Sequence, residues 1–429
     1  MSTALANLEA QENSDENHLF VLNRQNGPPK ILFSLHAPGP YASLSPVLHQ
    51  LVDRQLSVAC ISSGENGGID SRIRNDFSND YQENPFDLST NLNPDLFVVS
   101  FDPQQKRLIS IIEKTLAKSN PALVVIEDYP GDCRQILEEM LQKGIMPEHV
   151  LVPVTDQQES YKILYPNLSI TTVGNPAFDR ILPWKEEDSA QIKELFNTTP
   201  DSVVVSYIGL PTQDFPRTGF GIEVAGITTW DSLESFALQQ LIKLMHSVAQ
   251  LRPENHFTFI YKPHPRDNSD LMPIVNIKHP ENLQVISGSQ QYWETHNIQP
   301  SKIAQFSHIV FAVMSTVLDE IAIRNSLSGT TFPLPASLIP KGFSPGYMNP
   351  DPNSVFHRIN FSTLPIVTNH ASRLIESPDD LYRVVYDILL GRHEWLEQMK
   401  KHQEIFAQKY LFPHPDATNR IFSVINGYL

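Results

Sequence analysis

ILFSLHAPGPYASLSPVLHQLVDRQLSVACISS, residues 31–63, is the stretch that decides the fold of this 429-residue chain. It contains an apolar run, a loop with glycine and proline, an amphipathic run and a second apolar run, in that order. Strands that are apolar throughout are buried on both faces, as in a parallel sheet covered by helices. The alternation continues through apolar runs at 96–102, 122–128 and 149–155, so we expect a doubly wound α/β domain here.

A second series of the same kind follows a break at residues 178–201, where prolines flank a charged segment. Its predicted strands are 202–210, 257–263, 283–288, 308–314 and 328–334, and its predicted helices include 235–251 and 316–325. We therefore predict an α/β protein of two Rossmann-like, doubly wound domains that face a cleft. The predicted divisions are a flexible acidic tail at 1–28, an N-terminal domain at 29–182, a C-terminal domain at 183–410 and a closing helix at 411–429.

Charge and hydropathy exclude several classes of function. The chain has 48 acidic and 32 basic residues, a formal charge of −16, which repels a phosphate backbone, so we expect no nucleic-acid partner. The first residues lack the basic start and apolar run of a signal peptide, and no apolar stretch approaches the roughly 18 residues of a membrane helix. We therefore expect a cytoplasmic protein with no integral membrane segment.

Motifs for metals and cofactors are not found in the sequence. Cys60 and Cys133 lie in apolar surroundings that are typical of buried thiols, not of a zinc site or a disulfide framework. The patterns H-E-x-x-H and C-x-x-C and the phosphate loop are absent as well. The sequence thus predicts neither a metal site nor a cofactor.

Two loops of the N-terminal domain carry candidate catalytic residues, because ligands of such sheets bind beyond the carboxyl ends of the strands. His36 follows the first strand and could take a proton from an attacking hydroxyl; the alternative is a structural turn with a local hydrogen bond. Glu127 and Asp128 end another strand, and one of them, Asp128 in preference, could be a general base. The alternative is that both are solvated and that Asp132 caps the next helix.

The C-terminal domain carries a candidate site for an anion in FIYKPHPRD, residues 259–267. At the end of this strand, Lys262 and Arg266 could neutralise a phosphate leaving group, and His264 could donate a proton to it. The prolines between them restrict the turn and display the cations at the cleft. A surface turn with solvated charges is the alternative.

Further candidates for binding a donor molecule follow two other strands of this domain. Ser315 and Thr316 begin a helix, where hydroxyls and free backbone N–H groups can bind an anion, and Glu320 could reach a ribose hydroxyl. An ordinary helix cap accounts for Ser315 equally well. Gly209 and Gln213 follow the first strand of the domain and would face the same crevice.

VGNPAFDRIL, residues 173–182, precedes the predicted linker between the domains. Its turn could be a hinge in which Asn175 hydrogen-bonds a ligand, and a plain turn is the alternative. The segment closely resembles the T-G-N-P-x-x-D-x-L motif at the domain junction of UDP-N-acetylglucosamine 2-epimerases. Several GT-B transferases, including CDP-glycerol-using enzymes, share this motif.

Three other segments resemble GT-B enzymes. K-P-H-P at 262–265 is similar to the His-Pro motif of bacterial sialyltransferases and polysialyltransferases and to the R-P-H-P of glycerophosphotransferases. IEDYPGD at 126–132 resembles the acidic pair followed by glycine in the same sialyltransferases. The segment 307–323 resembles their Ser-Ser/Thr motif and the D-S-G-G-x-x-E-E-A of the 2-epimerases, although both glycines are missing.

The resemblance covers most of residues 30–425 and implies a metal-independent GT-B glycosyltransferase. The C-terminal domain would hold a nucleotide-sugar donor, and the N-terminal domain would hold a carbohydrate or other hydroxyl acceptor. Asp128 or His36 would deprotonate the acceptor, and His264 would assist the departing phosphate. Two alternatives stay open: a hydrolysing UDP-sugar 2-epimerase, and a non-catalytic sugar-nucleotide-binding protein of the same fold.

Overall fold

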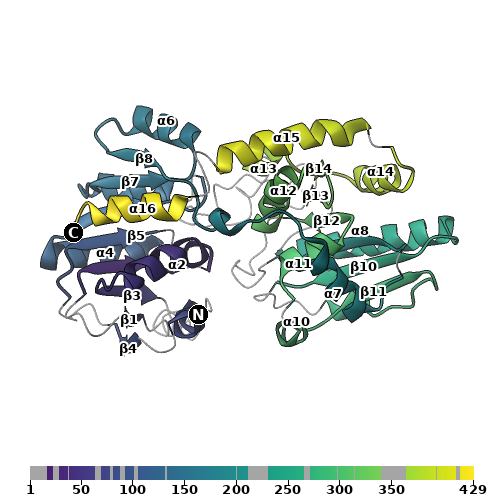
Figure 1. Cartoon of the computed structure of the whole chain (residues 1–429), viewed down its shortest axis with the longest axis horizontal. Coiled ribbons are helices and arrows are strands. Elements are labelled where there is room, and N and C mark those ends of the chain that lie inside the picture. The colour runs from purple at the N-terminus through teal and green to yellow at the C-terminus, as the bar shows by residue number, and fades with distance from the viewer. Residues whose placement is uncertain are drawn as a thin grey trace, which may run out of the picture. The chain divides into compact units, whose positions relative to one another are not determined.

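Two compact units make up the structure (Figure 1), a computed structural model that describes residues 17–22, 29–36, 38–62, 69–77, 81–86, 92–100, 105–130, 133–199, 201–210, 230–264, 271–296, 298–313, 315–339, 364–392, 394–411 and 416–429. Unit 1 comprises Met1–Arg180 and Lys409–Leu429, and unit 2 comprises Ile181–Gln408. The chain therefore passes from unit 1 into unit 2 and returns to unit 1 for its last helix.

Unit 1 is built on a sheet with the strand order β4-β1-β3-β2-β5-β6-β7-β8. From β3 to β8 along this order the neighbouring strands are parallel, whereas β1 is antiparallel to both β3 and β4. The strands are β1 (His18–Leu22), β2 (Ile31–Ser34), β3 (Val58–Ser62), β4 (Tyr81–Pro85), β5 (Leu96–Val99), β6 (Ala122–Ile126), β7 (His149–Val152) and β8 (Ile170–Thr172). The helices are α2 (Pro38–Asp53), α3 (Ile69–Asp76), α4 (Gln105–Ser119), α5 (Arg134–Gln142), α6 (Thr155–Leu164), the 3₁₀ turn η3 (Phe178–Arg180) and α16 (Ala417–Asn426).

Helices cover both faces of this sheet. Ile31 and Phe33 of β2 are buried in one apolar cluster with side chains of α2, α3 and α16. Leu32, between them, is buried in the other cluster with side chains of α4, α5 and α6. Because successive side chains of a strand point to opposite faces, a strand that is apolar throughout fits only a sheet covered on both sides.

The structure differs from the expected N-terminal tail at residues 18–22. These residues form β1, which pairs with β3 from His18 opposite Ser62 to Leu22 opposite Val58. Leu19, Phe20 and Leu22 are buried, so the apolar segment HLFVL gains burial by covering the edge of β3. The expectation of a tail rests on the acidic, polar composition of the preceding residues, and that composition does not extend to this short apolar run.

Unit 2 is built on a parallel sheet with the strand order β11-β10-β9-β12-β13-β14. The strands are β9 (Val203–Ile208), β10 (Phe257–Lys262), β11 (Leu283–Ser287), β12 (Ile309–Ala312), β13 (Leu334–Leu338) and β14 (Arg373–Ile375). The helices are α7 (Glu186–Phe196), α8 (Trp230–Leu251), α9 (Met272–Val275), α10 (Gln290–Thr295), α11 (Pro300–Phe306), α12 (Thr316–Ser328), α13 (Pro365–Thr368), α14 (Pro378–Leu389) and α15 (Glu394–Tyr410). The order reverses at β9, since the chain adds β10 and β11 on one side and β12 to β14 on the other.

The prediction of an α/β protein with two Rossmann-like domains is confirmed. The observed units end two residues before the predicted divisions at 182 and 410. Within the part of the chain that the structure describes, no helix combines the length and apolar character needed to cross a bilayer.

Candidate functional site

The switch in strand order places the candidate site of unit 2 at the carboxyl ends of β9, β10 and β12, which are neighbours in the sheet. Ligands of doubly wound sheets bind where the strand order reverses. Gly209 follows β9, His264 follows β10 by two residues, and Ser315 precedes α12, the helix after β12. Three segments that are far apart in the sequence therefore end at one edge of one sheet.

Gly209 brings the ends of β9 and β10 into close contact. Its backbone N–H donates to the carbonyl oxygen of Lys262 at 2.9 Å. A β-carbon at this position would lie 3.1 Å from the backbone nitrogen of His264 and 3.2 Å from the α-carbon of Pro263. Only a residue without a side chain fits between these backbone atoms, so the absence of a side chain at Gly209 allows the histidine turn to pack against β9.

Lys262 is not displayed to solvent, contrary to the expectation for this turn. Its side chain is buried, and its Nζ lies 5.8 Å from the centre of the Trp293 ring. A cation within about 6 Å of an indole face is attracted to the ring. Lys262 thus lies buried beneath the strand end, while His264 is half-buried. Arg266 and Gln213 lie outside the described residues.

The start of α12 is a capped helix N-terminus. The Oγ of Ser315 accepts a hydrogen bond from the backbone N–H of Val317 at 3.3 Å, and Thr316 is exposed. Glu320 forms an ion pair with Arg324 at 2.8 Å, one turn further along the helix. The ordinary helix cap is therefore present. The carboxylate of Glu320, which is expected to reach a ribose hydroxyl, pairs with a residue of its own helix, and the role of Glu320 in binding stays a prediction.

Two buried carboxyl groups of unit 2 were missed in the sequence. Glu234 of α8 is fully buried and accepts hydrogen bonds from the hydroxyl of Tyr207 at 2.6 Å and from the backbone N–H of Leu210 at 3.2 Å. Asp319 of α12 is buried, and burial raises its pKa from 3.8 to about 8. Glu234 lies on the same face of α8 as the buried Leu238. An acidic residue on an apolar helix face is the sequence signal from which its burial could have been predicted.

In unit 1 the strand order reverses between β2 and β5, and His36 lies just past the end of β2. Its ring is buried, and Nε2 lies 2.6 Å from the Oγ of Ser34. The local hydrogen bond of the alternative interpretation is thus present. The position at the switch point equally fits the predicted role as a base.

Glu127 and Asp128 separate at the end of β6. Glu127 is buried and accepts hydrogen bonds from the hydroxyl of Tyr161, at 2.7 Å, and from the amide of Gln157, both on α6. Asp128 lies instead against the start of α2, where its Oδ2 accepts a 3.4 Å hydrogen bond from the Oγ of Ser43. Asp128 therefore lies near the loop that carries His36, whereas Glu127 ties β6 to a helix.

The VGNPAFDRIL segment makes hydrogen bonds to two other parts of unit 1, the end of β6 and the start of α16. The amide of Asn175 donates to the backbone carbonyl oxygen of Asp128 at 2.7 Å, so Asn175 supports the candidate base. The carboxylate of Asp179 accepts hydrogen bonds from the backbone N–H groups of Ala417 and Thr418, at 3.0 and 2.8 Å. Asp179 thereby caps α16 and joins the last helix of the chain to the turn.

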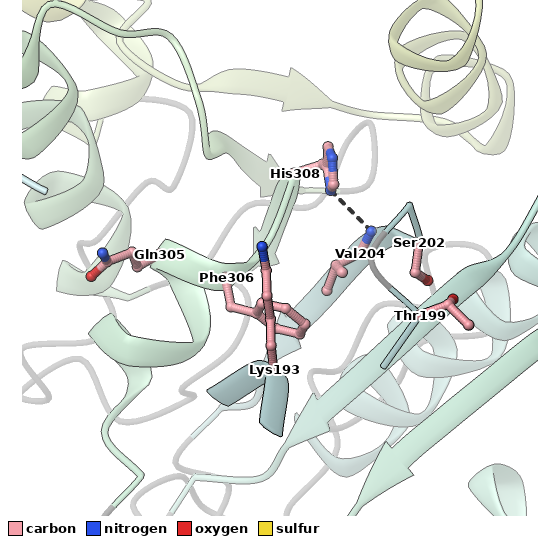
Figure 2. Close-up of a pocket in the computed structure, with 7 residues that line it drawn as sticks. All are labelled: Lys193, Thr199, Ser202, Val204, Gln305, Phe306 and His308. Carbon is pink, nitrogen blue, oxygen red and sulfur yellow. Dashed lines mark hydrogen bonds between the residues drawn. The ribbon is translucent and has the colours of Figure 1, made fainter. Parts of the chain in front are cut away.

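A small surface pocket of about 200 Å³ lies at the other end of the unit 2 sheet (Figure 2). It is lined by Lys193, Thr199, Ser202, Val204, Gln305, Phe306 and His308. His308 accepts a hydrogen bond on Nδ1 from the backbone N–H of Val204 at 3.0 Å. Val204 lies near the start of β9 and His308 precedes β12, so this pocket is separate from the candidate site at the carboxyl ends.

Comparisons with solved structures identify the fold. The chain is similar to a putative UDP-N-acetylglucosamine 2-epimerase from Listeria monocytogenes, with 12% identity, 94% of this chain and 96% of that chain covered, and a TM-score of 0.53. It is also similar to S. aureus MnaA solved with UDP (11% identity, 93% and 96% covered, TM-score 0.55). The UDP-GlcNAc 2-epimerase from Neisseria meningitidis, bound to UDP-GlcNAc, gives 11% identity, 92% and 100% coverage and a TM-score of 0.53. No protein-family model and no curated protein matches the sequence.

These similarities show that the chain has a GT-B-like fold over nearly its full length. The predicted resemblance is thus confirmed for the fold. The more specific resemblance to sialyltransferases stays a prediction, as do the roles of the candidate residues.

Proposed function

We propose that this protein is a glycosyltransferase that moves a sugar from a nucleotide-activated donor to a hydroxyl acceptor without a metal ion. The observation that carries the proposal is the packing of the histidine turn on Gly209, next to the start of α12, at the point where the unit 2 sheet reverses. Such an edge offers backbone N–H groups and cationic side chains to a diphosphate.

Unit 2 would hold the donor nucleotide. The start of α12, at Ser315 and Thr316, offers hydroxyl and backbone N–H groups near the positive end of a helix dipole. Lys262, which is buried at the same strand ends, would add a positive potential. His264 would donate a hydrogen bond or a proton to the phosphate oxygen as its bond to the sugar breaks.

Unit 1 would activate the acceptor. We assign the base to Asp128, with His36 as the alternative, because both lie near the start of α2 in unit 1. The acceptor oxygen forms a bond to the anomeric carbon while the bond from that carbon to the phosphate oxygen breaks. The acceptor proton passes to the base. Glu127 has a structural role instead, since its carboxylate is engaged by α6.

A hydrolysing UDP-sugar 2-epimerase is the second candidate. Fold similarity to proteins described as 2-epimerases, one of them solved with UDP-GlcNAc, favours it. Against it, Ser315 and Thr316 stand near the position where the 2-epimerase motif has two glycines. Side chains there restrict how closely the backbone can approach a diphosphate. A third candidate is a protein that binds sugar nucleotides without turnover.

Nucleotide binding is tested first, by the change in melting temperature with UDP, CDP, CMP and GDP. A ligand that binds only the folded state raises this temperature. We expect one nucleotide to do so, and His264→Ala to reduce the shift. His256→Ala is the matched control, since His256 is exposed at the amino end of the same strand, β10. No shift with any nucleotide, or equal shifts in both variants, would contradict the assignment.

Product analysis separates the three candidates. The chain is incubated with a sugar nucleotide of the base that binds, with and without a mixture of hydroxyl acceptors. Release of nucleotide that requires an acceptor supports transfer. Release of a 2-epimeric sugar without an acceptor supports the 2-epimerase, and binding without turnover under all conditions supports the binding protein.

A further inference from the structure

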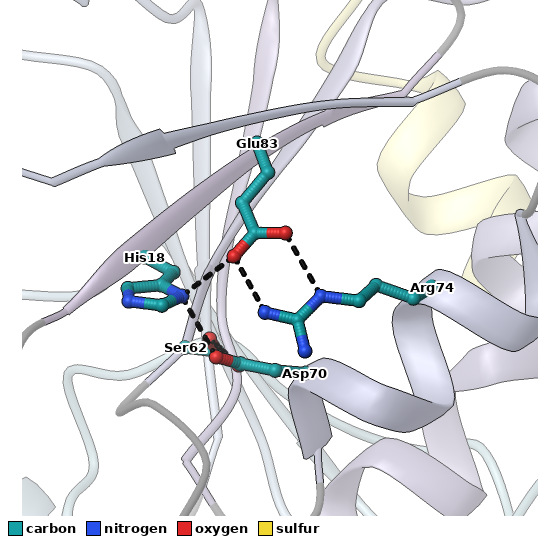
Figure 3. Close-up of polar contacts among 5 residues, drawn as sticks. All are labelled: His18, Ser62, Asp70, Arg74 and Glu83. Carbon is teal, nitrogen blue, oxygen red and sulfur yellow. Dashed lines mark hydrogen bonds and ion pairs between the residues drawn. The ribbon is translucent and has the colours of Figure 1, made fainter.

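A second group of polar side chains lies in unit 1, at the edge where β1 and β4 extend the parallel sheet (Figure 3). It contains His18 at the start of β1, Asp70 in the first turn of α3, and Glu83 in the middle of β4. One ligand-type atom from each side chain lies within 4.8 Å of the other two. The group belongs to none of the residues assigned above to donor or acceptor.

Both carboxylates approach the same ring nitrogen. The Nδ1 of His18 lies 2.9 Å from Oδ2 of Asp70 and 2.8 Å from Oε1 of Glu83. A ring nitrogen carries either one proton or one lone pair along one direction, so it can be well aligned with at most one of the two oxygens. Nδ1 accordingly makes no well-aligned hydrogen bond with any described residue. Three electron-rich atoms therefore converge on a point between them.

Asp70 gives the strongest indication of a cation site. Its side chain is fully buried, and its Oδ1 accepts a hydrogen bond from the Oγ of Ser62. Its Oδ2, which faces the ring nitrogen, is buried without a hydrogen-bond partner among the described residues. A buried carboxylate oxygen without a well-aligned hydrogen bond is costly, because it has lost its contact with water. A metal ion between the three ligand atoms would replace the interaction with water that this oxygen has lost.

Arg74 orients Glu83 from the outside. Its guanidinium donates to both carboxylate oxygens, at 2.9 and 2.6 Å. Outer hydrogen bonds of this kind fix the orientation of carboxylates that ligate metals. Arg74 also acts against metal binding, because its positive charge weakens the attraction of the site for a cation.

From this geometry we infer that His18, Asp70 and Glu83 bind a divalent transition-metal ion, of which Zn²⁺ fits best. One imidazole nitrogen and two carboxylate oxygens are ligands that zinc accepts, and a water molecule completes four-coordination. Bonds of about 2.0–2.1 Å in a tetrahedron place ligand atoms roughly 3.3 Å apart, so each carboxylate oxygen needs to move only about half an ångström from Nδ1 of His18. The exposed fractions of His18 and Glu83, 19% and 25%, leave a path for the ion.

The ion would be structural. It would join β1 and β4 to α3, and through Ser62 to β3, and so would fasten the antiparallel strands to the parallel sheet. The inference is independent of the proposed function, in which the metal takes no part. This metal site could not be predicted from the sequence, because the three ligands lie in separate elements and form no short motif.

The test uses the full chain, freed of metal with a chelator and then titrated with Zn²⁺. We expect one Zn²⁺ per chain and a melting temperature several degrees higher than with the chelator. Co²⁺ in place of Zn²⁺ should give visible absorption bands. Asp70→Asn and His18→Ala should each weaken Zn²⁺ binding at least tenfold. Asp53→Asn, at an exposed acidic residue of the same unit, is the matched control and should bind Zn²⁺ as the wild type does.

Three results would overturn the inference. The first is a chain whose melting temperature responds to neither Zn²⁺ nor chelator, since the group would then be an ion pair. The second is Zn²⁺ binding that both variants retain. The third, decisive even where the variants do not fold, is a wild-type chain that gives no Co²⁺ spectrum.

Discussion

A β-carbon on Gly209 would lie 2.6 Å from Oε1 of Glu234, a distance that real β-carbons do not adopt. The Glu234 side chain is constrained, because it is fully buried and accepts hydrogen bonds from Tyr207, Leu210 and, on Oε1, Tyr261. The same β-carbon would press on the backbone of His264 on its other side. Glu234 and the histidine turn thus enclose Gly209, and this contact determines how the ends of β9 and β10 meet.

Gly209→Ala should therefore lower the free energy of unfolding by about 1–3 kcal/mol, the usual cost of overpacking. It should also weaken nucleotide binding, because the histidine turn has to shift. Gly39→Ala is the control, since its β-carbon would lie 3.4 Å from Oδ2 of Asp128, an ordinary contact. Chemical denaturation and nucleotide titration measure both effects. An alanine at 209 that leaves both quantities unchanged would show that the turn is not held by this contact.

Adjacent carboxylates at the end of β6 should respond differently to substitution. Glu127→Ala leaves the hydroxyl of Tyr161 without its acceptor, so we expect a loss of about 1–3 kcal/mol in the free energy of unfolding. Asp128→Asn should change stability little but lower the turnover rate roughly 10²–10⁴-fold, as for loss of a general base. Denaturation and steady-state kinetics give the two numbers. If the Asp128→Asn variant keeps its turnover rate, His36 is the general base instead.

The cap on α16 provides a test of the turn in VGNPAFDRIL. Asp179→Ala removes the acceptor for two backbone N–H groups of α16, so the free energy of unfolding should fall by about 1–2 kcal/mol. Asp179→Asn keeps an acceptor oxygen and should lose less. Urea denaturation of the two variants measures the difference. Equal stability of Asp179→Ala and the wild type would mean that α16 is held by its apolar face alone.

Buried Asp319 predicts a specific dependence of stability on pH. Its pKa is raised from 3.8 to about 8, so the folded chain keeps a proton that the unfolded chain loses. Stability should therefore fall as pH rises between these values, by about 1.4 kcal/mol per pH unit from this group. Asp319→Asn, which mimics the protonated form, should remove that slope. Urea denaturation from pH 5 to pH 8 checks the difference, and parallel curves for variant and wild type would contradict it.

Most of the strands could be predicted because their signal is local. The runs at β2, β3, β5, β6, β9, β10 and β12 are mostly apolar, and nearly all of their residues are buried. The predicted strand at 328–334 is wrong in position: α12 extends to Ser328 and the strand is Leu334–Leu338. That strand, LPASL, has a proline and two small residues, so it lacks the apolar run on which the prediction depended.

The places of the candidate residues in their sheets could be predicted, and their roles in binding and catalysis stay predictions. The rule for strand ends places His36, Asp128, Gly209 and His264 at the carboxyl edges of their sheets, where the structure has them. It does not separate Glu127 from Asp128, because neighbouring residues share the same sequence environment and differ only in which helix packs against them.

The sequence by itself determined the α/β class, the two-domain division and the strand ends at which chemistry is expected. Each of these follows from the order of neighbouring residues, since burial and chain direction repeat over a few positions. Tertiary structure alone decided that Lys262 is buried against Trp293, that Glu234 lies beneath Gly209, and that His18 meets Asp70. Those contacts join residues far apart in the chain, and they exist only once the order of the strands in the sheet brings them together.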